Sequence, residues 1–160
     1  MLPTAWKVWT WKEYYADCVA FAKSLIASDV PLFHVVNMIG FNSPEWVIAN
    51  MGAILAGDIA AGIYTSNTPD ACHYVSSHSK AEFVVCEGNM QLAKYAKIEE
   101  RLSDLKGVIV WGDTPDPTIV KKFARAKVFT WDEWLQVGSG VSERPLRRAR
   151  TRSAPATAPP

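Results

Sequence analysis

Apolar residues follow two alternating patterns along the chain, short continuous runs and helically spaced stripes. The continuous runs lie at 34–40, 59–64, 82–87, 108–111 and 128–129. Between them, apolar residues recur three or four positions apart, which is typical of a helix with one buried face. Continuous apolar strands need cover on both faces of a sheet. Their alternation with amphipathic helices therefore predicts an α/β fold with a mostly parallel sheet flanked by helices.

Capping motifs predict where the helices begin. Thr10 and Glu13 are spaced as a capping box, in which each side chain bonds the other residue's backbone amide, and Thr130 and Glu133 repeat this spacing. Further helix starts are predicted at Ser43-Pro44, Thr68-Pro69 and Asn89. The apolar spacing then predicts helices near 11–28, 44–57, 71–79, 89–105, 118–124 and after 130. Gly57 is placed to end the second of these helices in a left-handed conformation.

Charge is distributed unevenly between the body of the chain and its end. The net charge of the 160 residues is +1, but the residues up to Glu143 sum to −4 and the last seventeen to +5. The segment 141–160 combines five Arg, four Pro and four Ala without helical or strand periodicity. We expect a domain over residues 7–142 and a disordered basic tail over 143–160. Arginines without aromatic neighbours favour a solvated tail, so no nucleic-acid partner is predicted.

Cysteine use and hydropathy indicate a cytoplasmic protein. The three cysteines, Cys18, Cys72 and Cys86, lie far apart in apolar stretches, so a reducing compartment is expected rather than a disulfide framework. The N-terminus lacks the basic and apolar regions of a secretory signal. The apolar stretch 47–64 is interrupted by Asp58 and loosened by glycines, and no transmembrane segment is predicted.

The motifs that usually bind phosphate or metal are absent from the sequence. No Gly-x-Gly-x-x-Gly occurs, and no glycine is followed by lysine. Gly40 to Ser43 joins a predicted strand to a helix start, but it contains Phe41 and has no basic residue nearby, so it is interpreted as a structural connection. His73 and His78 lie about 140° apart around a helix and do not share a face. No metal-binding residues are predicted.

The loop Tyr64, Thr65, Ser66, Asn67 is the most site-like segment of the sequence. It follows a predicted strand and is rich in hydroxyl and amide groups. Open α/β sheets bind ligands at the carboxyl ends of their strands, which favours a binding site here. The same residues also suit a turn and a helix cap, so both interpretations stay open.

Three tryptophans gather near the N-terminus. Trp6, Trp9 and Trp11 lie close to two lysines, a combination that can stack on nucleic acid. Their alternation with other residues instead predicts an extended segment that packs tryptophans at the core or the domain edge.

Four segments, in order, carry a resemblance to a known family. They are residues 9–14, 39–46, 52–57 and 61–72, and the likeness runs from about Lys7 to about Ser142. Together they resemble the N-terminal part of the AMP-forming acyl-CoA synthetases, which are adenylate-forming enzymes, and in particular the bubblegum-type long-chain fatty acid–CoA ligases.

The resemblance implies a two-step reaction in fatty acid metabolism. In the family, ATP and Mg²⁺ activate a fatty acid carboxylate as an acyl adenylate, and coenzyme A then takes the acyl group. The likeness ends before the phosphate loop and the C-terminal lid, so no catalytic, cofactor-binding or metal-binding residue is carried over. Tyr64 to Asn67 are expected to help wall the acyl pocket. The family also implies a location in the cytoplasm, peripheral to the endoplasmic reticulum membrane.

Two functions remain open at this point. The chain is expected to be a fragment of a long-chain fatty acid–CoA ligase that binds no cofactor and is inactive alone. The alternative is a non-catalytic module that associates with a full-length synthetase or holds an acyl chain. A sheet cut from a larger domain would expose apolar faces, which favours association.

Overall fold

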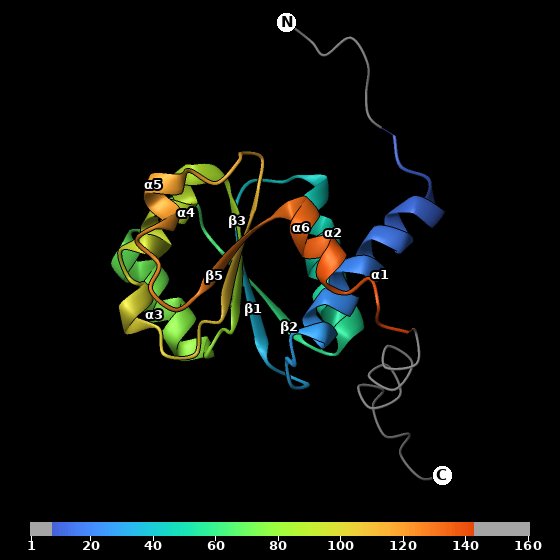
Figure 1. The fold of residues 1–160 in the computed structure, drawn as a ribbon, viewed down its shortest axis with the longest axis horizontal. Coiled ribbons are helices and arrows are strands. Elements are labelled where there is room, and N and C mark those ends of the chain that lie inside the picture. Colours follow the sequence, from blue (N-terminus) through green and yellow to red (C-terminus); the bar gives the residue numbers. More distant parts are fainter. Residues whose placement is uncertain (1–7, 143–160) are drawn as a thin grey trace, which may run out of the picture.

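The computed structural model describes residues 8–142, in which helices and strands alternate (Figure 1). The predicted disordered tail, 143–160, and Trp6 lie outside the described residues. The elements in chain order are α1 (Trp11–Ala27), β1 (Val35–Ile39), α2 (Pro44–Ala56), β2 (Ile59–Ile63), α3 (Pro69–Ser79), β3 (Phe83–Glu87), α4 (Gly88–Ala96), the 3₁₀ helix η1 (Glu99–Arg101), β4 (Gly107–Trp111), α5 (Pro117–Val120), β5 (Lys127–Thr130) and α6 (Trp131–Val137).

The five strands form a single parallel sheet in the order β2-β1-β3-β4-β5. In the central pairs, Val36 lies opposite Phe83, and Phe83 opposite Gly107. The predicted α/β class and the mostly parallel sheet are confirmed. The chain places β2 on one side of β1 and all later strands on the other side. The topological switch point of the sheet therefore lies between β1 and β3.

Helices cover both faces of the sheet in two layers. Figure 1 shows α1, α2 and α6 on one face and α3, α4 and α5 on the other. The first layer packs through an aromatic cluster in which the Trp134 ring lies 5.0 Å from Phe83 and 5.8 Å from Phe21, measured between centroids. The second layer packs through Leu92 and Tyr95 on α4, both fully buried. Burial on both faces explains why the strands read as continuous apolar runs.

Most of the predicted helix caps are confirmed. Thr10 with Glu13, and Thr130 with Glu133, form reciprocal capping boxes. The hydroxyls of Ser43 and Thr68 accept from the amides of the third helical residue in α2 and α3, and Gly57 ends α2 at φ 94°. Among residues 8–142, no helix has the length and apolarity needed to cross a membrane.

The predicted start and end of the fourth helix are wrong. Asn89 does not cap α4; its side chain donates to the Thr114 carbonyl and accepts from the Asp116 amide, which ties down the loop after β4. The helix also ends at Ala96 rather than near Leu105. Ile98, Leu102 and Leu105 have the spacing of a buried helix face, which is why a longer helix was predicted. In the structure they are buried by η1 and the loops around it, without a continuous helix. The next helix, α5, spans Pro117–Val120 and is shorter than predicted.

The extended conformation predicted for the N-terminal tryptophans is also wrong for Trp11. This residue is the first of α1 and is 86% exposed, because the Thr10 capping box starts the helix immediately before it. The Trp9 indole nitrogen donates to the Asp17 carboxylate.

Candidate functional site

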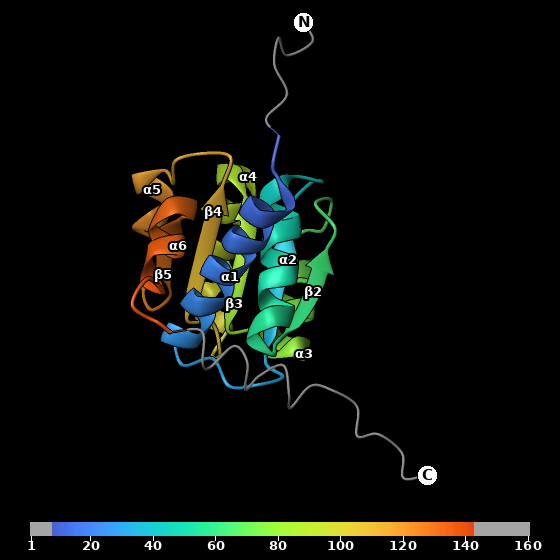
Figure 2. The same ribbon diagram turned by 90° about the vertical axis from the view of Figure 1, so that its right-hand side faces the viewer.

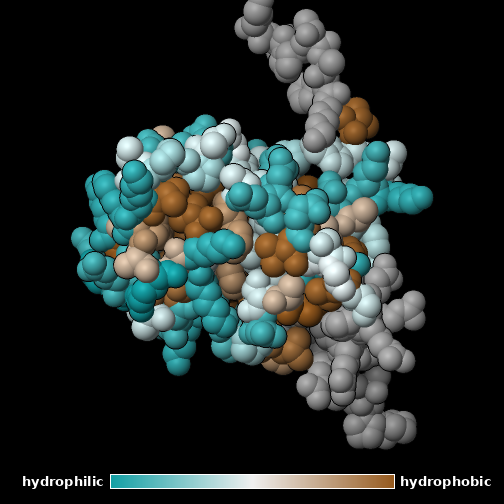
Figure 3. All heavy atoms as spheres, viewed as in Figure 1, coloured by the Kyte–Doolittle hydropathy of each residue, from teal (hydrophilic) through white to brown (hydrophobic). Residues whose placement is uncertain are grey.

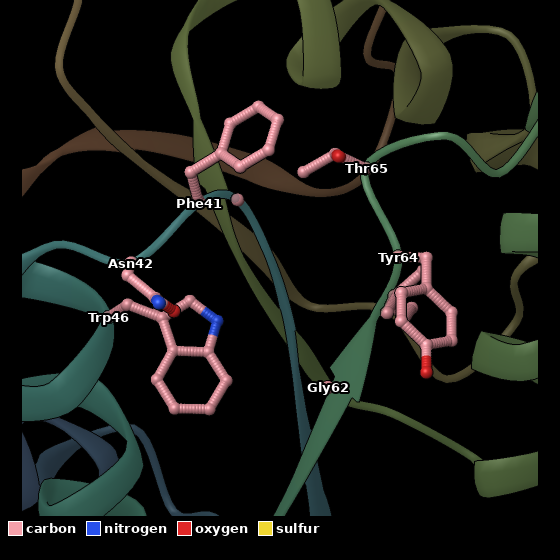
Figure 4. A pocket seen from close by; sticks show the side chains of 8 residues that line it. Phe41, Asn42, Trp46, Gly62, Tyr64 and Thr65 are labelled. Carbon is pink, nitrogen blue, oxygen red and sulfur yellow. The ribbon is translucent and has the colours of Figure 1, made fainter.

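The carboxyl ends of β1 and β2 form an open hollow of about 640 Å³. It is lined by residues 40–42 after β1, by Trp46 on α2 and by residues 62–65 at the end of β2 (Figure 4). The two strands are parallel neighbours, with Ile39 opposite Ile63, so the loops that follow them start side by side. None of the lining residues carries a formal charge.

The structure places two of the four predicted site residues in this hollow. Tyr64 and Thr65 line it, whereas Ser66 and Asn67 do not belong to the lining and form the adjacent turn, in which the Asn67 amide donates to the Tyr64 carbonyl. Figure 4 shows the Thr65 side chain directed toward Phe41 across the mouth, while the Tyr64 ring lies on the far side of β2 from Trp46. Tyr64 is 83% exposed.

Sequence reasoning missed the other wall of the hollow. Phe41 and Asn42 belong to the segment interpreted as a structural connection, and Trp46 lies in the helix predicted near 44–57, to which the sequence assigns no binding role. The pairing of β1 with β2 is the signal that could have found them, since it places both loops at one sheet edge.

Gly62 and Trp46 lie close together on one side of the hollow. A Cβ atom on Gly62 would lie 3.6 Å from the Trp46 ring, which is ordinary van der Waals contact. The indole therefore packs close over Gly62 and leaves no room for a ligand between the ring and the strand. Its remaining surface contributes an apolar side to the hollow.

A cation next to the hollow is already bonded to the protein. The Lys94 Nζ on α4 donates to the Thr65 carbonyl at 2.6 Å and so anchors the loop after β2 from the other helical layer. Ser66 lies in the same loop, between Thr65 and Thr68, the residue that caps α3. The loop is therefore anchored at one end by the Lys94 bond and at the other by the start of α3.

The switch point between β1 and β3, where open α/β sheets usually bind ligands, is filled by the chain itself. The Glu87 carboxylate at the end of β3 accepts from the Phe41 amide at 2.7 Å. A Cβ atom on Gly40 would come within 2.3 Å of the Trp111 ring, so only glycine allows the indole to pack there. The Asp113 carboxylate accepts from the Asn89 amide nearby. The Glu87 carboxylate thus occupies the Phe41 amide and places negative charge at the switch point, which disfavours a nucleotide phosphate there.

The histidines and cysteines of the described residues are engaged in other contacts or buried. Within 8–142, no group of three His, Cys, Asp or Glu side chains is placed to hold a metal ion. His73 hydrogen-bonds with the Arg101 side chain and carbonyl, while His78 stacks on Tyr74. Cys72 and Cys86 are free and buried, and burial raises the pKa of both thiols, which keeps them protonated and unreactive.

Comparison with known families decides the affiliation of the chain. A family model described as AMP-binding enzyme matches residues 2–155, which is most of the chain. The chain belongs to the AMP-binding enzyme family. Since the match reaches beyond residue 142, the boundary expected between domain and tail stays a prediction.

The relatives of this AMP-binding enzyme chain are much longer than the chain itself. It is 38% identical over 141 residues to the long-chain-fatty-acid–CoA ligase ACSBG2 of Xenopus laevis, covering 88% of the chain and 18% of the relative. It is 40% identical over 143 residues to ACSBG2 of Gallus gallus, covering 89% and 18%. These matches confirm the resemblance to long-chain fatty acid–CoA ligases, of which the chain spans less than a fifth.

Solved structures of adenylate-forming enzymes share the fold. The anthranilate CoA ligase AuaEII, in complex with anthranoyl-AMP, matches with a TM-score of 0.68 at 20% identity, covering 78% of this chain and 22% of that one. The A-PCP didomain of a carboxylic acid reductase from Segniliparus rugosus, in complex with AMP, matches with a TM-score of 0.74 at 16% identity, covering 85% and 21%. The sheet and its helical layers therefore correspond to part of an adenylate-forming domain.

Proposed function

We propose that this chain supplies part of the acyl-binding wall of a long-chain fatty acid–CoA ligase, with Tyr64 to Asn67 forming its rim. The uncharged hollow between the ends of β1 and β2 is the observation that carries the proposal. The lining combines apolar surface from Phe41, Trp46 and Ile63 with uncharged polar groups, and the apolar part can take an alkyl chain. A phosphate would instead need unoccupied amides or cations. The similarity to the ACSBG2 ligases supports a fatty acid as the ligand class.

We further propose that the chain alone does not form an acyl adenylate. In a complete ligase, the fatty acid carboxylate is activated with ATP and Mg²⁺ and then transferred to coenzyme A. The residues at the strand ends do not fit that role, because Glu87 fills the switch point and Lys94 is bonded to the Thr65 carbonyl. No catalytic, cofactor-binding or metal-binding residue is assigned. We expect the protein in the cytoplasm, peripheral to the endoplasmic reticulum membrane.

A second candidate function is a non-catalytic module that associates with a full-length synthetase or holds an acyl chain. The exposure of apolar side chains on α2 and β2 favours association, since Ile54 and Ile59 are each about half exposed (50% and 48%). Large exposed apolar surfaces mark interaction sites in soluble proteins.

Quenching of tryptophan fluorescence by a brominated fatty acid tests the acyl-wall proposal. Bromine quenches an indole on contact, so palmitate brominated along its chain should quench Trp46 when the alkyl group enters the hollow. We expect the Trp46→Phe variant to lose most of the saturable quenching, because its indole lines the site. The matched control is Trp131→Phe, which changes a partly buried indole at the start of α6, next to the opposite edge strand β5, where it packs against Phe21. Equal quenching in both variants, or none in the unmodified chain, contradicts the proposal.

A further inference from the structure

The first turns of α1 and α2 form a groove lined by aromatic and apolar side chains. Its volume is about 410 Å³, and it lies between the segment that enters α1 and the start of α2. The lining residues are Trp9, Thr10, Trp11, Tyr14, Pro44, Val47 and Ile48. Figure 2 shows the two helices side by side, with both of them starting at the upper edge of the molecule. None of the lining residues carries a formal charge.

Two aromatic rings shape one side of this groove. The Trp11 and Tyr14 rings lie 6.1 Å apart between centroids and are inclined at 72° to each other. Trp11 is 86% exposed, and tryptophan and tyrosine are enriched in protein interfaces. Figure 3 shows apolar residues reaching the surface among polar ones where α1, α2 and α6 lie. Aromatic grooves recognise proline-rich segments, because proline holds these segments in an extended conformation before they bind.

Carboxylates lie at the rim of the groove. Two of them accept hydrogen bonds from lining residues: Glu13 from the amide and hydroxyl of Thr10, and Asp17 from the indole nitrogen of Trp9. Glu45 lies in the first turn of α2. Negative charge around an apolar groove favours a ligand that combines apolar residues with positive charge.

The two lysines of α1 lie on another side of this helix. Lys12 and Lys23 line a separate hollow between α1 and α6. The aromatic groove between α1 and α2 therefore presents carboxylates rather than cations to a ligand.

The end of this chain has the composition that such a groove recognises. Residues 144–160 contain five Arg and four Pro and carry a net charge of +5, whereas the residues before them sum to −4. The arginines have no aromatic neighbours in the sequence, which is why a solvated tail is predicted. The groove supplies aromatic rings and carboxylates from a distant part of the fold.

The segment 144–160 is long enough to reach the groove. A Cβ atom on Gly138 would lie 2.4 Å from the backbone of Lys23 and Ser24, so the chain passes the C-terminal half of α1 shortly before residue 142. Trp11 is about 18 Å from that point at the rise of 1.5 Å per residue of a helix. Seventeen residues in a polyproline conformation extend about 50 Å. Because the segment is tethered, a modest intrinsic affinity is sufficient for docking.

We propose that the aromatic groove between the first turns of α1 and α2 binds residues 144–160 of the same chain. Prolines pack against Trp11 and Tyr14, and arginines pair with the carboxylates at the rim. Charge complementarity favours this basic segment over an acidic or neutral ligand. The proposal does not depend on the acyl-wall function, because the groove and the hollow at the ends of β1 and β2 share no lining residue.

A spin label near the end of the full 160-residue chain tests this contact. Ala158→Cys provides the attachment point, since the three native cysteines are buried. In a proton–nitrogen NMR spectrum, the label should strongly broaden the indole N–H signals of Trp9 and Trp11. The backbone amides of α3, in the opposite helical layer, should broaden only weakly. Raising the ionic strength to about 1 M should reduce the broadening, because salt screens the charge pairs.

Two exposed aromatic residues give a matched pair of variants. Trp11→Ala removes a ring from the groove and should lower the ratio of docked to free tail about tenfold, measured as loss of broadening at Trp9. Tyr74→Ala removes a 69% exposed ring from α3 and should leave the broadening unchanged. Thermal melts of both variants check that the fold persists.

Each outcome decides the question. Broadening at Trp9 that Trp11→Ala removes and Tyr74→Ala keeps supports the docking. Weak and uniform broadening, or broadening that persists in Trp11→Ala, contradicts it. If a labelled chain broadens the signals of an isotope-enriched chain without a spin label, the tail comes from a second copy and the proposal is overturned. Binding to phosphatidylcholine vesicles that Trp11→Ala abolishes, without broadening in their absence, makes a lipid surface the occupant and also overturns the proposal.

Discussion

At the scale of single residues, Asp58 is a carboxylate in unusual surroundings. It lies between α2 and β2, is only 7% exposed, and neither carboxylate oxygen has a hydrogen-bond partner. The neighbouring Glu82 carboxylate is paired with His34 and Lys106, both at 2.6 Å, so these two groups do not neutralise Asp58. Burial, followed by the charge of Glu82, raises the pKa of Asp58 to about 7.

This raised pKa predicts a pH-dependent stability. Between about pH 4 and 7 the folded protein holds a proton on Asp58 that the unfolded chain has released, so the free energy of unfolding falls as pH rises through this window. Asp58→Asn should remove this contribution and be more stable than the unmodified protein at pH 8, by roughly 1–4 kcal/mol, while matching it at pH 4.5. Urea denaturation at both pH values measures the difference.

The control for this prediction is the exposed Asp104. Asp104→Asn should follow the pH dependence of the unmodified protein, because a solvated carboxyl gains little from losing its charge. An Asp58→Asn variant that is equally or less stable at pH 8 would show that Asp58 is ionised at no cost in the folded state.

At the scale of the elements, Ser24 joins the first helix to the last. Its hydroxyl donates to the Trp134 carbonyl of α6 at 2.6 Å and accepts from the Gly138 amide at 3.1 Å, and all three groups are buried. A Cβ atom on Gly138 would meet the backbone of Lys23 and Ser24 at 2.4 Å, so glycine is needed for this close approach. The segment 131–138 is therefore an integral part of the fold.

Removal of this hydroxyl should loosen α6. Ser24→Ala removes the hydroxyl that donates to the buried Trp134 carbonyl and one of the two acceptors of the Gly138 amide, and we expect it to lower the free energy of unfolding by about 1–3 kcal/mol. Ser28→Ala serves as the comparison, because the Ser28 hydroxyl bonds the Ser24 carbonyl within the same chain turn and at a less buried position. Chemical denaturation of both variants gives the two values; an equal loss in each would mean that Ser24 does not dock α6.

The ends of helices could be predicted from the sequence where neighbouring residues determine them. The prediction failed where the deciding contacts come from residues far away in the chain. The capping pairs Thr10–Glu13 and Thr130–Glu133 and the left-handed Gly57 could be identified because they satisfy their own helix ends. The end of α4 could not be predicted, since the Glu99 carboxylate after it accepts from the amides of Arg125 and Ala126, more than twenty residues away.

The same division applies to the candidate site. Tyr64 and Thr65 could be placed at a strand end from the sequence, but the wall opposite them depends on the pairing of β1 with β2. The role of Glu87 could not be predicted from the sequence. Its carboxylate accepts from the Phe41 amide, which lies 46 residues earlier in the chain.

At the scale of the whole molecule, the described residues form a well-packed α/β unit that matches 18% of the length of the ACSBG2 ligases of Xenopus laevis and Gallus gallus. In the described residues, an apolar layer packs on each face of the five-stranded sheet, while the outer side of α2 and the hollow beside β2 remain open to solvent. Binding of an alkyl chain needs only such a hollow, but adenylate formation needs groups that stabilise phosphate charge. At the strand ends, the Glu87 and Asp113 carboxylates accept from the Phe41 and Asn89 amides and place negative charge there, which disfavours a phosphate.

The central claim is that the chain can bind an alkyl chain but cannot form an acyl adenylate. The most direct test is palmitate-dependent exchange of radiolabelled pyrophosphate into ATP. The purified 160-residue chain should show no palmitate-dependent exchange under conditions in which full-length Gallus gallus ACSBG2 is assayed alongside as the reference for the reaction. Palmitate-dependent exchange by the chain alone would contradict the account, because we assign no phosphate-binding residue among residues 8–142.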